Sequence, residues 1–216
     1  MKKLRILLAD DHEVIRHGVR GLIEKEAGWE VCGEAVDGRK AVTLAERLKP
    51  DVVVLDISMP ELNGLEVTRQ IKRSLPKTEV LIFTGEESER LIHDVFAAGA
   101  RSYILKSDIS EHLVNAIRAL GQHEHYFTSA ISEVVFARYL DSTSGADKDE
   151  LGGLTSRERQ IVQLLAEGKS NKEVGTLLGI SIKTVETHRA ATMRKLRLDS
   201  FAGLVRYAIR NKITKA

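Results

Sequence analysis

The sequence lacks the features that mark secreted, membrane-spanning and disordered proteins. Its 216 residues include one cysteine, Cys32, so no disulfide can form within the chain. No apolar run approaches the roughly 20 residues that a transmembrane helix needs. After the basic start, Asp10 and Asp11 interrupt the apolar stretch that a signal peptide would require. With 43% hydrophobic residues the chain can form packed cores. We therefore expect a folded, cytoplasmic protein without a membrane span.

The near-neutral total charge conceals two parts of opposite sign. Residues 151–216 hold 13 Lys and Arg against 5 Asp and Glu, whereas residues 1–150 hold 20 against 26. A polar, glycine-containing stretch at 141–153 lies between them and is typical of a linker. An acidic part followed by a basic part predicts two units with different partners, and the basic one favours nucleic acid.

The first part alternates between strand-like and helix-like segments. Apolar, β-branched runs predict five strands, at 4–9, 30–36, 51–55, 79–83 and 102–105. The segments between them repeat apolar residues at helical spacing, and one more helix is expected at 129–140. This alternation predicts an α/β fold, a flavodoxin-like doubly wound sheet of five parallel strands with helices on both faces.

The basic part carries helical patterns only. Four hydroxyl residues can cap helix starts: Thr155, Ser170, Ser181 and Ser200. The first two are followed three residues later by glutamate, which matches the capping box. Gly179 separates the second and third helices as the turn of a helix-turn-helix does. We expect an all-helical, four-helix domain.

Polar residues in the first part fall at the ends of predicted strands. Asp10 and Asp11 follow the first strand, Asp56 the third, Thr84 the fourth and Lys106 the fifth. Converging carboxylates repel each other unless a cation neutralises them, and Mg²⁺ suits such oxygen ligands. Asp56 is then the candidate phosphoryl acceptor, with Lys106 and Thr84 contacting the transferred group. A strand-end aspartate is often only a turn residue, but this combination makes coincidence improbable.

Four stretches resemble the receiver domain of bacterial response regulators: Leu8–His12, Val54–Gly64, Thr84–Gly85 and Gly99–Lys106. The resemblance covers about residues 1–122 and implies that Asp56 accepts phosphate from a histidine kinase. It further implies that Asp11 and Asp56 hold Mg²⁺ directly, with Asp10 acting mainly through water. The main chain of Ser58 is expected to add another oxygen ligand.

The same resemblance implies a conformational switch. Thr84 and Tyr103 match the pair whose hydroxyl and aromatic ring move when the phosphoryl group arrives. Phosphorylation is then expected to shift the receiver between two conformations and to bias domain contacts or dimerisation.

The predicted third helix of the basic part has an inward and an outward face. Its inward residues are Val185, Thr192, Met193 and Leu196, and its outward residues are Lys183, Glu186, Thr187, Ala190 and Arg194. The outward face can enter a major groove, where Glu186 accepts from a cytosine amino group and Thr187 or Ala190 touches a thymine methyl. A basic helix alone is more often a solvated face, but the capped preceding helix, the turn and the charge favour DNA.

The stretch from Leu154 to Leu196 resembles the LuxR-type DNA-binding domain. With the receiver motifs, the whole chain resembles a NarL/FixJ-type response regulator. The predicted DNA contacts are Lys169, Ser170, Asn171, Lys183, Thr184, Glu186, Thr187, His188, Arg189, Ala190 and Arg194. Two residues depart from the family pattern, Gly175 in place of alanine and Thr192 in place of a larger apolar residue. Both are expected to lower the stability of this domain, Gly175 by up to ~1 kcal/mol.

These observations predict a phosphorylation-controlled DNA-binding transcription regulator of a two-component system, and not an enzyme. The expected domains are a receiver at 1–122, a partly helical linker at 123–150 and a DNA-binding domain at 151–216. The expected partners are a histidine kinase, double-stranded DNA and a second copy of the chain. The last helix either supplies the dimer contact or packs only within its own domain, through Leu204, Val205, Tyr207 and Ala208.

Two alternatives belong to other functional classes. A phosphohydrolase that forms an aspartyl-phosphate usually needs a second acid two residues after the nucleophile, where this sequence has Ser58. A DNA-binding protein that uses the receiver fold only for dimerisation would not need the complete acidic set. A nicotinamide enzyme is disfavoured because no Gly-x-Gly-x-x-Gly follows the first strand.

Overall fold

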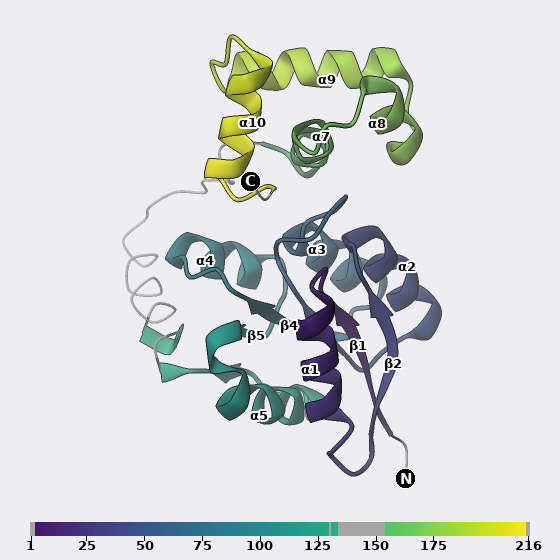
Figure 1. The fold of residues 1–216 in the computed structure, drawn as a ribbon, viewed down its shortest axis with the longest axis vertical. Coiled ribbons are helices and arrows are strands. Elements are labelled where there is room, and N and C mark those ends of the chain that lie inside the picture. The colour runs from purple at the N-terminus through teal and green to yellow at the C-terminus, as the bar shows by residue number, and fades with distance from the viewer. Residues whose placement is uncertain (1–2, 130, 134–153, 215–216) are drawn as a thin grey trace. The chain divides into compact units, whose positions relative to one another are not determined.

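The first of two compact units is a parallel sheet covered by helices (Figure 1). The computed structural model describes residues 3–129, 131–133 and 154–214. The sheet has the order β2-β1-β3-β4-β5-β6, and every pair of neighbouring strands is parallel. Its strands are β1 (Leu4–Ala9), β2 (Trp29–Ala35), β3 (Val52–Leu55), β4 (Glu79–Thr84), β5 (Ser102–Leu105) and β6 (Tyr126–Phe127).

Helices lie on both faces of this sheet (Figure 1). One face is covered by α1 (Glu13–Ile23) and α5 (Ile109–Gly121), and the other by α2 (Gly38–Leu48), α3 (Gly64–Ser74) and α4 (Glu89–Ala97). A 3₁₀ turn at Lys106–Asp108 joins β5 to α5. The core beneath α1 and α5 is entirely aliphatic apart from Phe83, with members such as Leu8, Val54 and Ile117 almost fully buried. This packing fixes the strand ends that carry the polar residues.

The predicted doubly wound α/β fold is confirmed, with all five predicted strands present within one residue at each end. The predicted strand count is corrected by β6, which lies in the segment that the sequence assigned to the linker. Two residues are too few to show a periodic pattern, and pairing with β5 holds them in place. Residues 129 and 131–133 are helical, whereas the rest of the helix predicted at 129–140 and the polar stretch at 141–153 lie outside the described residues.

Within the described residues 154–214, the second unit is built from four helices, as predicted (Figure 1). They are α7 (Ser156–Ala166), α8 (Asn171–Leu178), α9 (Ile182–Lys195) and α10 (Phe201–Arg210). Each helix begins after a hydroxyl side chain that accepts a hydrogen bond from a backbone N–H three residues on. Both predicted capping boxes are present, at Thr155 with Glu158 and at Ser170 with Glu173.

Two departures from the family pattern have visible consequences in this unit. A Cβ atom at Gly175 would lie 2.8 Å from the carbonyl oxygen of Ile180, so glycine lets α8 pass close to the backbone that leads into α9. The predicted cost of Gly175 in helix propensity is therefore accompanied by a packing reason for glycine. Thr192 is 1% exposed, and its hydroxyl has no hydrogen-bond partner among the described residues. No helix in the described part of the chain is long and apolar enough to span a bilayer.

Candidate functional site

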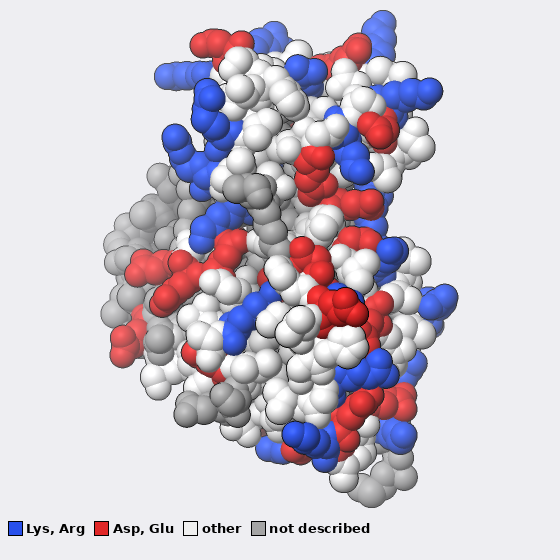
Figure 2. Space-filling model, in the orientation of Figure 1, with Lys and Arg blue, Asp and Glu red and all other residues white. Residues whose placement is uncertain are grey.

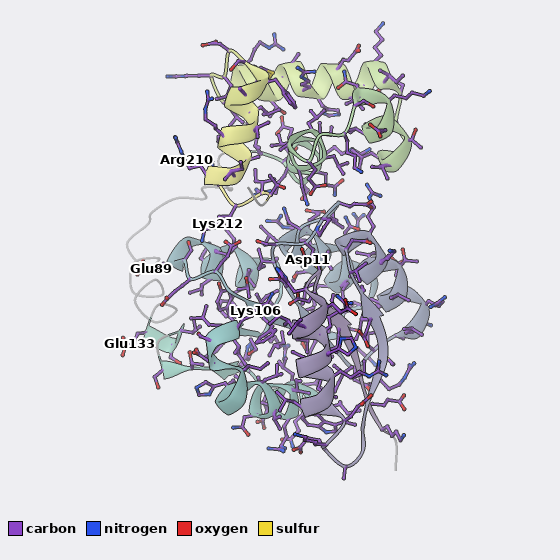
Figure 3. All side chains as sticks on the ribbon, in the orientation of Figure 1. Asp11, Glu89, Lys106, Glu133, Arg210 and Lys212 are labelled. Carbon is purple, nitrogen blue, oxygen red and sulfur yellow. The ribbon has the colours of Figure 1, made fainter. Side chains whose placement is uncertain are left out.

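The carboxyl ends of the parallel strands bring the predicted acidic residues together. Ligand atoms of Asp10, Asp11, Asp56 and His12 all lie within 4.8 Å of one another. Figure 3 shows Asp11 and Lys106 at this edge of the sheet. His12 was not among the predicted site residues, and its Nδ1 lies 3.0 Å from Oδ1 of both Asp10 and Asp11. No residue spacing in the sequence marks His12, because the contact depends on how the loop after β1 turns.

Lys106 neutralises part of this acidic charge. Its Nζ lies 2.7 Å from Oδ2 of Asp10 and 3.0 Å from Oδ2 of Asp56. Both carboxylates are buried, at 5% and 3% exposure, so water screens these pairs little. Burial opposes the charged form of Lys106, but Asp56 and Asp10 outweigh it and raise the pKa of the ammonium group. Lys106 therefore keeps its positive charge at neutral pH and holds the two acids in one cluster.

The backbone around Asp56 fixes the direction of its carboxylate. The N–H of Ile57 donates to Oδ1 of Asp56 at 2.8 Å, while Lys106 contacts Oδ2. Gly64, the first residue of α3, donates its N–H to the carbonyl oxygen of Ile57 at 2.8 Å. A Cβ atom at Gly64 would lie only 2.3 Å from the carbonyl oxygen of Asp56. The structure thus places Gly64 against the loop that carries Asp56.

The predicted switch residues lie on neighbouring strands beneath the β4–α4 loop. Thr84 and Tyr103 are both fully buried. The N–H of Glu86 donates to Oγ1 of Thr84 at 3.3 Å, and the hydroxyl of Tyr103 donates to the carbonyl oxygen of Glu86. Burial raises the pKa of Tyr103, and the nearby carboxylates of Glu86 and Glu87 raise it further. The ring therefore stays neutral and acts as a hydrogen-bond donor to this loop.

Glu86 is a further residue that the sequence did not single out. Its carboxylate accepts a hydrogen bond from the hydroxyl of Ser58, two residues after Asp56. Glu86 thus contacts the acceptor loop with its side chain and both switch residues with its main chain. The described contacts of Ser58 involve its hydroxyl, so the ligand role predicted for its main chain stays a prediction. A loop glutamate carries no pattern by which this position could have been recognised.

The structure confirms which residues of α9 face the core of the helical unit and which are exposed. Val185 and Thr192 are buried, and Met193 and Leu196 pack against the core of the helical unit. All five predicted outward residues are exposed, namely Lys183, Glu186, Thr187, Ala190 and Arg194. Lys and Arg side chains project around this unit in Figure 2. The exposed face of α9 is thus free of the packing that holds the opposite face.

The remaining predicted DNA contacts lie at the start of α8 and within α9. Ser170 is an exposed cap whose hydroxyl donates to the carboxylate of Glu173 at 2.7 Å, and Lys169 and Asn171 beside it are half-buried. Thr184, His188 and Arg189 are half-buried as well. The guanidinium of Arg189 lies 5.3 Å from the centre of the Phe201 ring, a cation–π contact with α10. These residues therefore differ in how much of each side chain is available to a ligand.

Comparison with known proteins identifies both units. The family model for the response regulator receiver domain matches residues 6–118, and that for bacterial regulatory proteins of the luxR family matches residues 153–208. The transcriptional regulatory protein LiaR of Bacillus subtilis is 39% identical over 210 residues, which cover 97% of this chain and 99% of LiaR. The oxygen regulatory protein NreC of Staphylococcus epidermidis is 37% identical over 216 residues, which cover 97% of this chain and 99% of NreC.

A solved structure agrees with this assignment. The RcsB response regulator of Salmonella typhimurium, described with conformational dynamism for DNA interaction, has a TM-score of 0.59 and 25% sequence identity. The match covers 96% of this chain and 98% of that one. Along this chain the receiver match precedes the luxR-family match, and the alignments with LiaR and NreC run over both units. The chain belongs to the NarL/FixJ-type response regulators, two-component transcription regulators in which a receiver domain precedes a LuxR-type DNA-binding domain.

Proposed function

We propose that Asp56 is the phosphoacceptor and that its phosphorylation controls DNA binding by the helical unit. The observation that carries this proposal is the position of the Lys106 ammonium group, within 3.0 Å of carboxylate oxygens on both Asp10 and Asp56. A nucleophilic carboxylate needs positive charge nearby when a phosphoryl group arrives, because that group brings further negative charge. Lys106 is held where that charge develops, and Asp56 is oriented by the backbone of Ile57.

The reaction is a transfer of a phosphoryl group from a phosphohistidine of a histidine kinase. A carboxylate oxygen of Asp56 forms the new bond to phosphorus, and the bond from phosphorus to the histidine nitrogen breaks. Lys106 stabilises the added charge, and the Thr84 hydroxyl donates to a phosphoryl oxygen. Tyr103 then follows Thr84, since both contact the loop at Glu86. The protein's own residues act as acceptor and switch, which makes the chain a regulator and not an enzyme.

The acidic cluster fits a Mg²⁺ ion by the chemistry of its donors. Carboxylate oxygens of Asp10, Asp11 and Asp56 lie within 4.8 Å of one another, and Mg²⁺ prefers such hard oxygen ligands. In the proposed site Asp11 and Asp56 bind the ion directly, Asp10 acts mainly through water, and the main chain of Ser58 adds an oxygen. When bound, the ion supplies positive charge that neutralises the phosphoryl oxygens. Lys106 shares that role from the β5 side of the cluster.

The helical unit is proposed to bind double-stranded DNA as a homodimer. Its exposed α9 face combines Lys183 and Arg194 for phosphates with Glu186 and Thr187 for base edges. The DNA interaction described for RcsB supports this proposal. The domain boundaries proposed from the sequence, at 122/123 and 150/151, remain part of it. Because DNA and the phosphorylated domain of a kinase are both met in the cytoplasm, we place the protein there.

Labelling with acetyl phosphate and Mg²⁺ tests the acceptor. Intact-mass spectrometry of the full chain is expected to detect one added phosphoryl group on the wild type and none on Asp56→Ala. Asp108→Asn serves as the matched control. Asp108 lies two residues after Lys106 in the sequence, but it is not a member of the acidic cluster. Equal labelling of wild type and Asp56→Ala would contradict the assignment. If phosphorylation does not change the affinity for DNA, the alternative is favoured in which the receiver serves only for dimerisation.

A further inference from the structure

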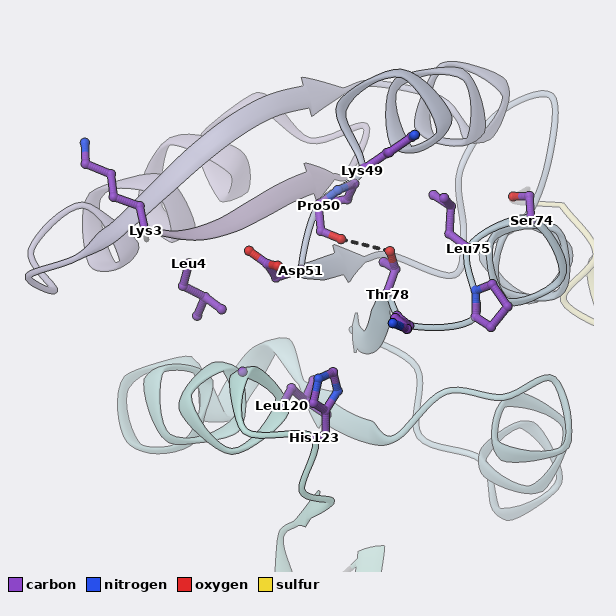
Figure 4. Close-up of a pocket in the computed structure, with 13 residues that line it drawn as sticks. Lys3, Leu4, Lys49, Pro50, Asp51, Ser74, Leu75, Thr78, Leu120 and His123 are labelled. Carbon is purple, nitrogen blue, oxygen red and sulfur yellow. Dashed lines mark hydrogen bonds between the residues drawn. The ribbon is translucent and has the colours of Figure 1, made fainter. Parts of the chain in front are cut away.

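A second concave site lies at the opposite end of the sheet from Asp56. A cavity of about 730 Å³ opens where the parallel strands begin (Figure 4). Four parts of the receiver line it, namely the start of β1, the α2–β3 connection, the α3–β4 connection and the end of α5. This volume lies within the range of about 300–1,000 Å³ that is usual for small-molecule sites. None of the residues proposed for phosphorylation or DNA binding lines it.

Hydrogen bonds between the lining segments hold the cavity open. The Thr78 hydroxyl donates to the carbonyl oxygen of Pro50 at 2.8 Å, which ties two of the connections together (Figure 4). The Lys72 ammonium group donates to the carbonyl oxygens of Pro76 and Thr78, both at 2.9 Å. Asp51 is bound to β1 through its own N–H and through its carboxylate. The walls are thus preorganised, which lowers the entropic cost of binding a ligand.

The floor of the cavity is apolar. Leu4, Leu75 and Leu120 come from three separate segments, and Pro50 is a further apolar residue of the lining. A Cβ atom at Gly121 would lie 3.0 Å from Cδ1 of Leu4, so glycine lets the end of α5 approach Leu4 closely. Burial of an apolar ligand surface against these residues removes it from water and favours binding.

The rim of the cavity is cationic. Lys3, Lys49 and Lys77 are among the lining residues. Within the described residues, neither Lys49 nor Lys77 forms an ion pair, and Lys3 lies 3.7 Å from a carboxylate oxygen of Glu30. The acid in the lining, Asp51, accepts a backbone N–H. In Figure 4 the ammonium groups of Lys3 and Lys49 point away from the cavity, so these exposed and flexible side chains would have to turn toward a ligand at its mouth.

We propose that this cavity binds a small organic anion, one with an apolar body for the leucine floor and an acidic group for Lys49 and Lys77. Such a ligand matches the cavity in two ways. Its apolar body fits the leucine floor, and its negative charge is attracted by the lysines of the rim. Phosphorylation is not needed for this binding, because the site and the Asp56 cluster share no residue.

A matched pair of probes tests the proposal on the full, unphosphorylated chain. 8-Anilinonaphthalene-1-sulfonate carries an apolar ring system and a sulfonate, and N-phenyl-1-naphthylamine has the same rings without the charge. The sulfonate probe is expected to bind saturably and more tightly than the neutral one. Two-dimensional amide NMR is expected to place its shifts at residues 3–4, 49–51, 74–78 and 120–123. Shifts confined to other parts of the chain would overturn the proposal.

Charge variants separate the proposed site from general attraction to lysine. Lys49→Gln with Lys77→Gln is expected to weaken the sulfonate probe about fivefold, the loss of two partly screened ion pairs, and to leave the neutral probe unchanged. Lys25→Gln with Lys172→Gln removes the same charge from exposed positions outside the cavity and is expected to change neither affinity. Equal affinity of the sulfonate probe for the two double variants would overturn the proposal. Circular dichroism of each variant confirms that it is folded.

Discussion

The hydroxyl of Ser58 donates a hydrogen bond to the carboxylate of Glu86 and so joins the loop after Asp56 to the loop after Thr84. The same glutamate accepts from Tyr103 with its carbonyl oxygen and donates to Oγ1 of Thr84 with its N–H. In the proposed switch the Thr84 hydroxyl moves toward a phosphoryl group on Asp56, and Glu86 is bound to Thr84, Tyr103 and Ser58. We therefore expect the hydrogen bonds of Glu86 to favour the unphosphorylated arrangement and to oppose the switch.

Ser58→Ala is expected to ease that switch. The substitution removes one hydrogen bond to a charged group, worth about 1.5 kcal/mol in its environment, and leaves the main chain in place. We expect the affinity for the phosphate analogue beryllofluoride with Mg²⁺ to rise by about three- to tenfold, measured by titration of amide NMR signals. Glu87→Gln, at the exposed position beside Glu86, is the control and is expected to leave the affinity unchanged. A weaker or equal affinity in Ser58→Ala would contradict the opposing role of this bond.

Gly64→Ala is expected to disturb the acceptor loop. The new Cβ would lie 2.3 Å from a backbone oxygen, so α3 or the loop after Asp56 must move. We expect the free energy of unfolding to fall by about 2 kcal/mol and labelling by acetyl phosphate to slow. Urea denaturation and intact-mass spectrometry measure the two effects. Gly21→Ala in α1 has nothing within 4 Å of its new Cβ and is expected to be neutral or stabilising by up to about 1 kcal/mol.

The sequence predicted what depends on regular structure. The five long strands follow from apolar runs, and Asp10, Asp56 and Lys106 meet because parallel strands end at one edge. β6 escaped prediction because its two residues are held by pairing and not by their own pattern. Local capping chemistry was equally accessible, since a hydroxyl and a glutamate three residues apart form a capping box wherever the helix begins.

Contacts between loops were beyond prediction. Glu86 and His12 enter the site through loop conformations that no spacing in the sequence encodes. Gly175 was interpreted through helix propensity alone, because its approach to the carbonyl of Ile180 depends on how α8 meets the next turn. The cavity at the opposite end of the sheet has the same origin, because its walls come from four segments that are distant in sequence.

Thr192→Val is expected to stabilise the DNA-binding domain. Valine keeps the β-branched shape, and it removes a buried hydroxyl that has no hydrogen-bond partner among the described residues. An unsatisfied buried hydroxyl costs about 1–3 kcal/mol, so the free energy of unfolding should rise by about 1 kcal/mol, measured by urea denaturation followed on helical signals. Thr176→Val lies on the exposed side of α8 and is expected to change stability little. A loss of stability in Thr192→Val would show that the hydroxyl has a partner.

Ser170→Ala is expected to raise the pKa of Glu173. The N–H and the hydroxyl of Ser170 donate to the Glu173 carboxylate at 2.8 and 2.7 Å and lower its pKa below the ordinary 4.5. A lowered pKa means that the capping box stabilises α8 above pH 4.5 and loses this contribution as the pH falls through the lowered value. Carbon NMR titration of the carboxyl group measures the shift, and Ser200→Ala, at the cap of α10, should leave it unchanged. A Glu173 pKa that is the same in both variants would contradict the capping contribution.

Lys183→Gln is expected to weaken DNA binding in a way that depends on salt and little on sequence. Lys183 is exposed on the outward face of α9 and carries a mobile positive charge suited to a phosphate. Each phosphate contact releases counterions, so its loss should make the slope of log affinity against log salt shallower by about 0.9 per protomer. Fluorescence anisotropy with one cognate and one scrambled duplex at several salt concentrations measures the slope. Glu186→Gln, on the same face, is expected instead to change the preference between duplexes that differ at one base pair, because a carboxylate accepts from cytosine. An unchanged slope in Lys183→Gln would remove this residue from the phosphate contacts and leave the remaining basic residues of the unit to supply them.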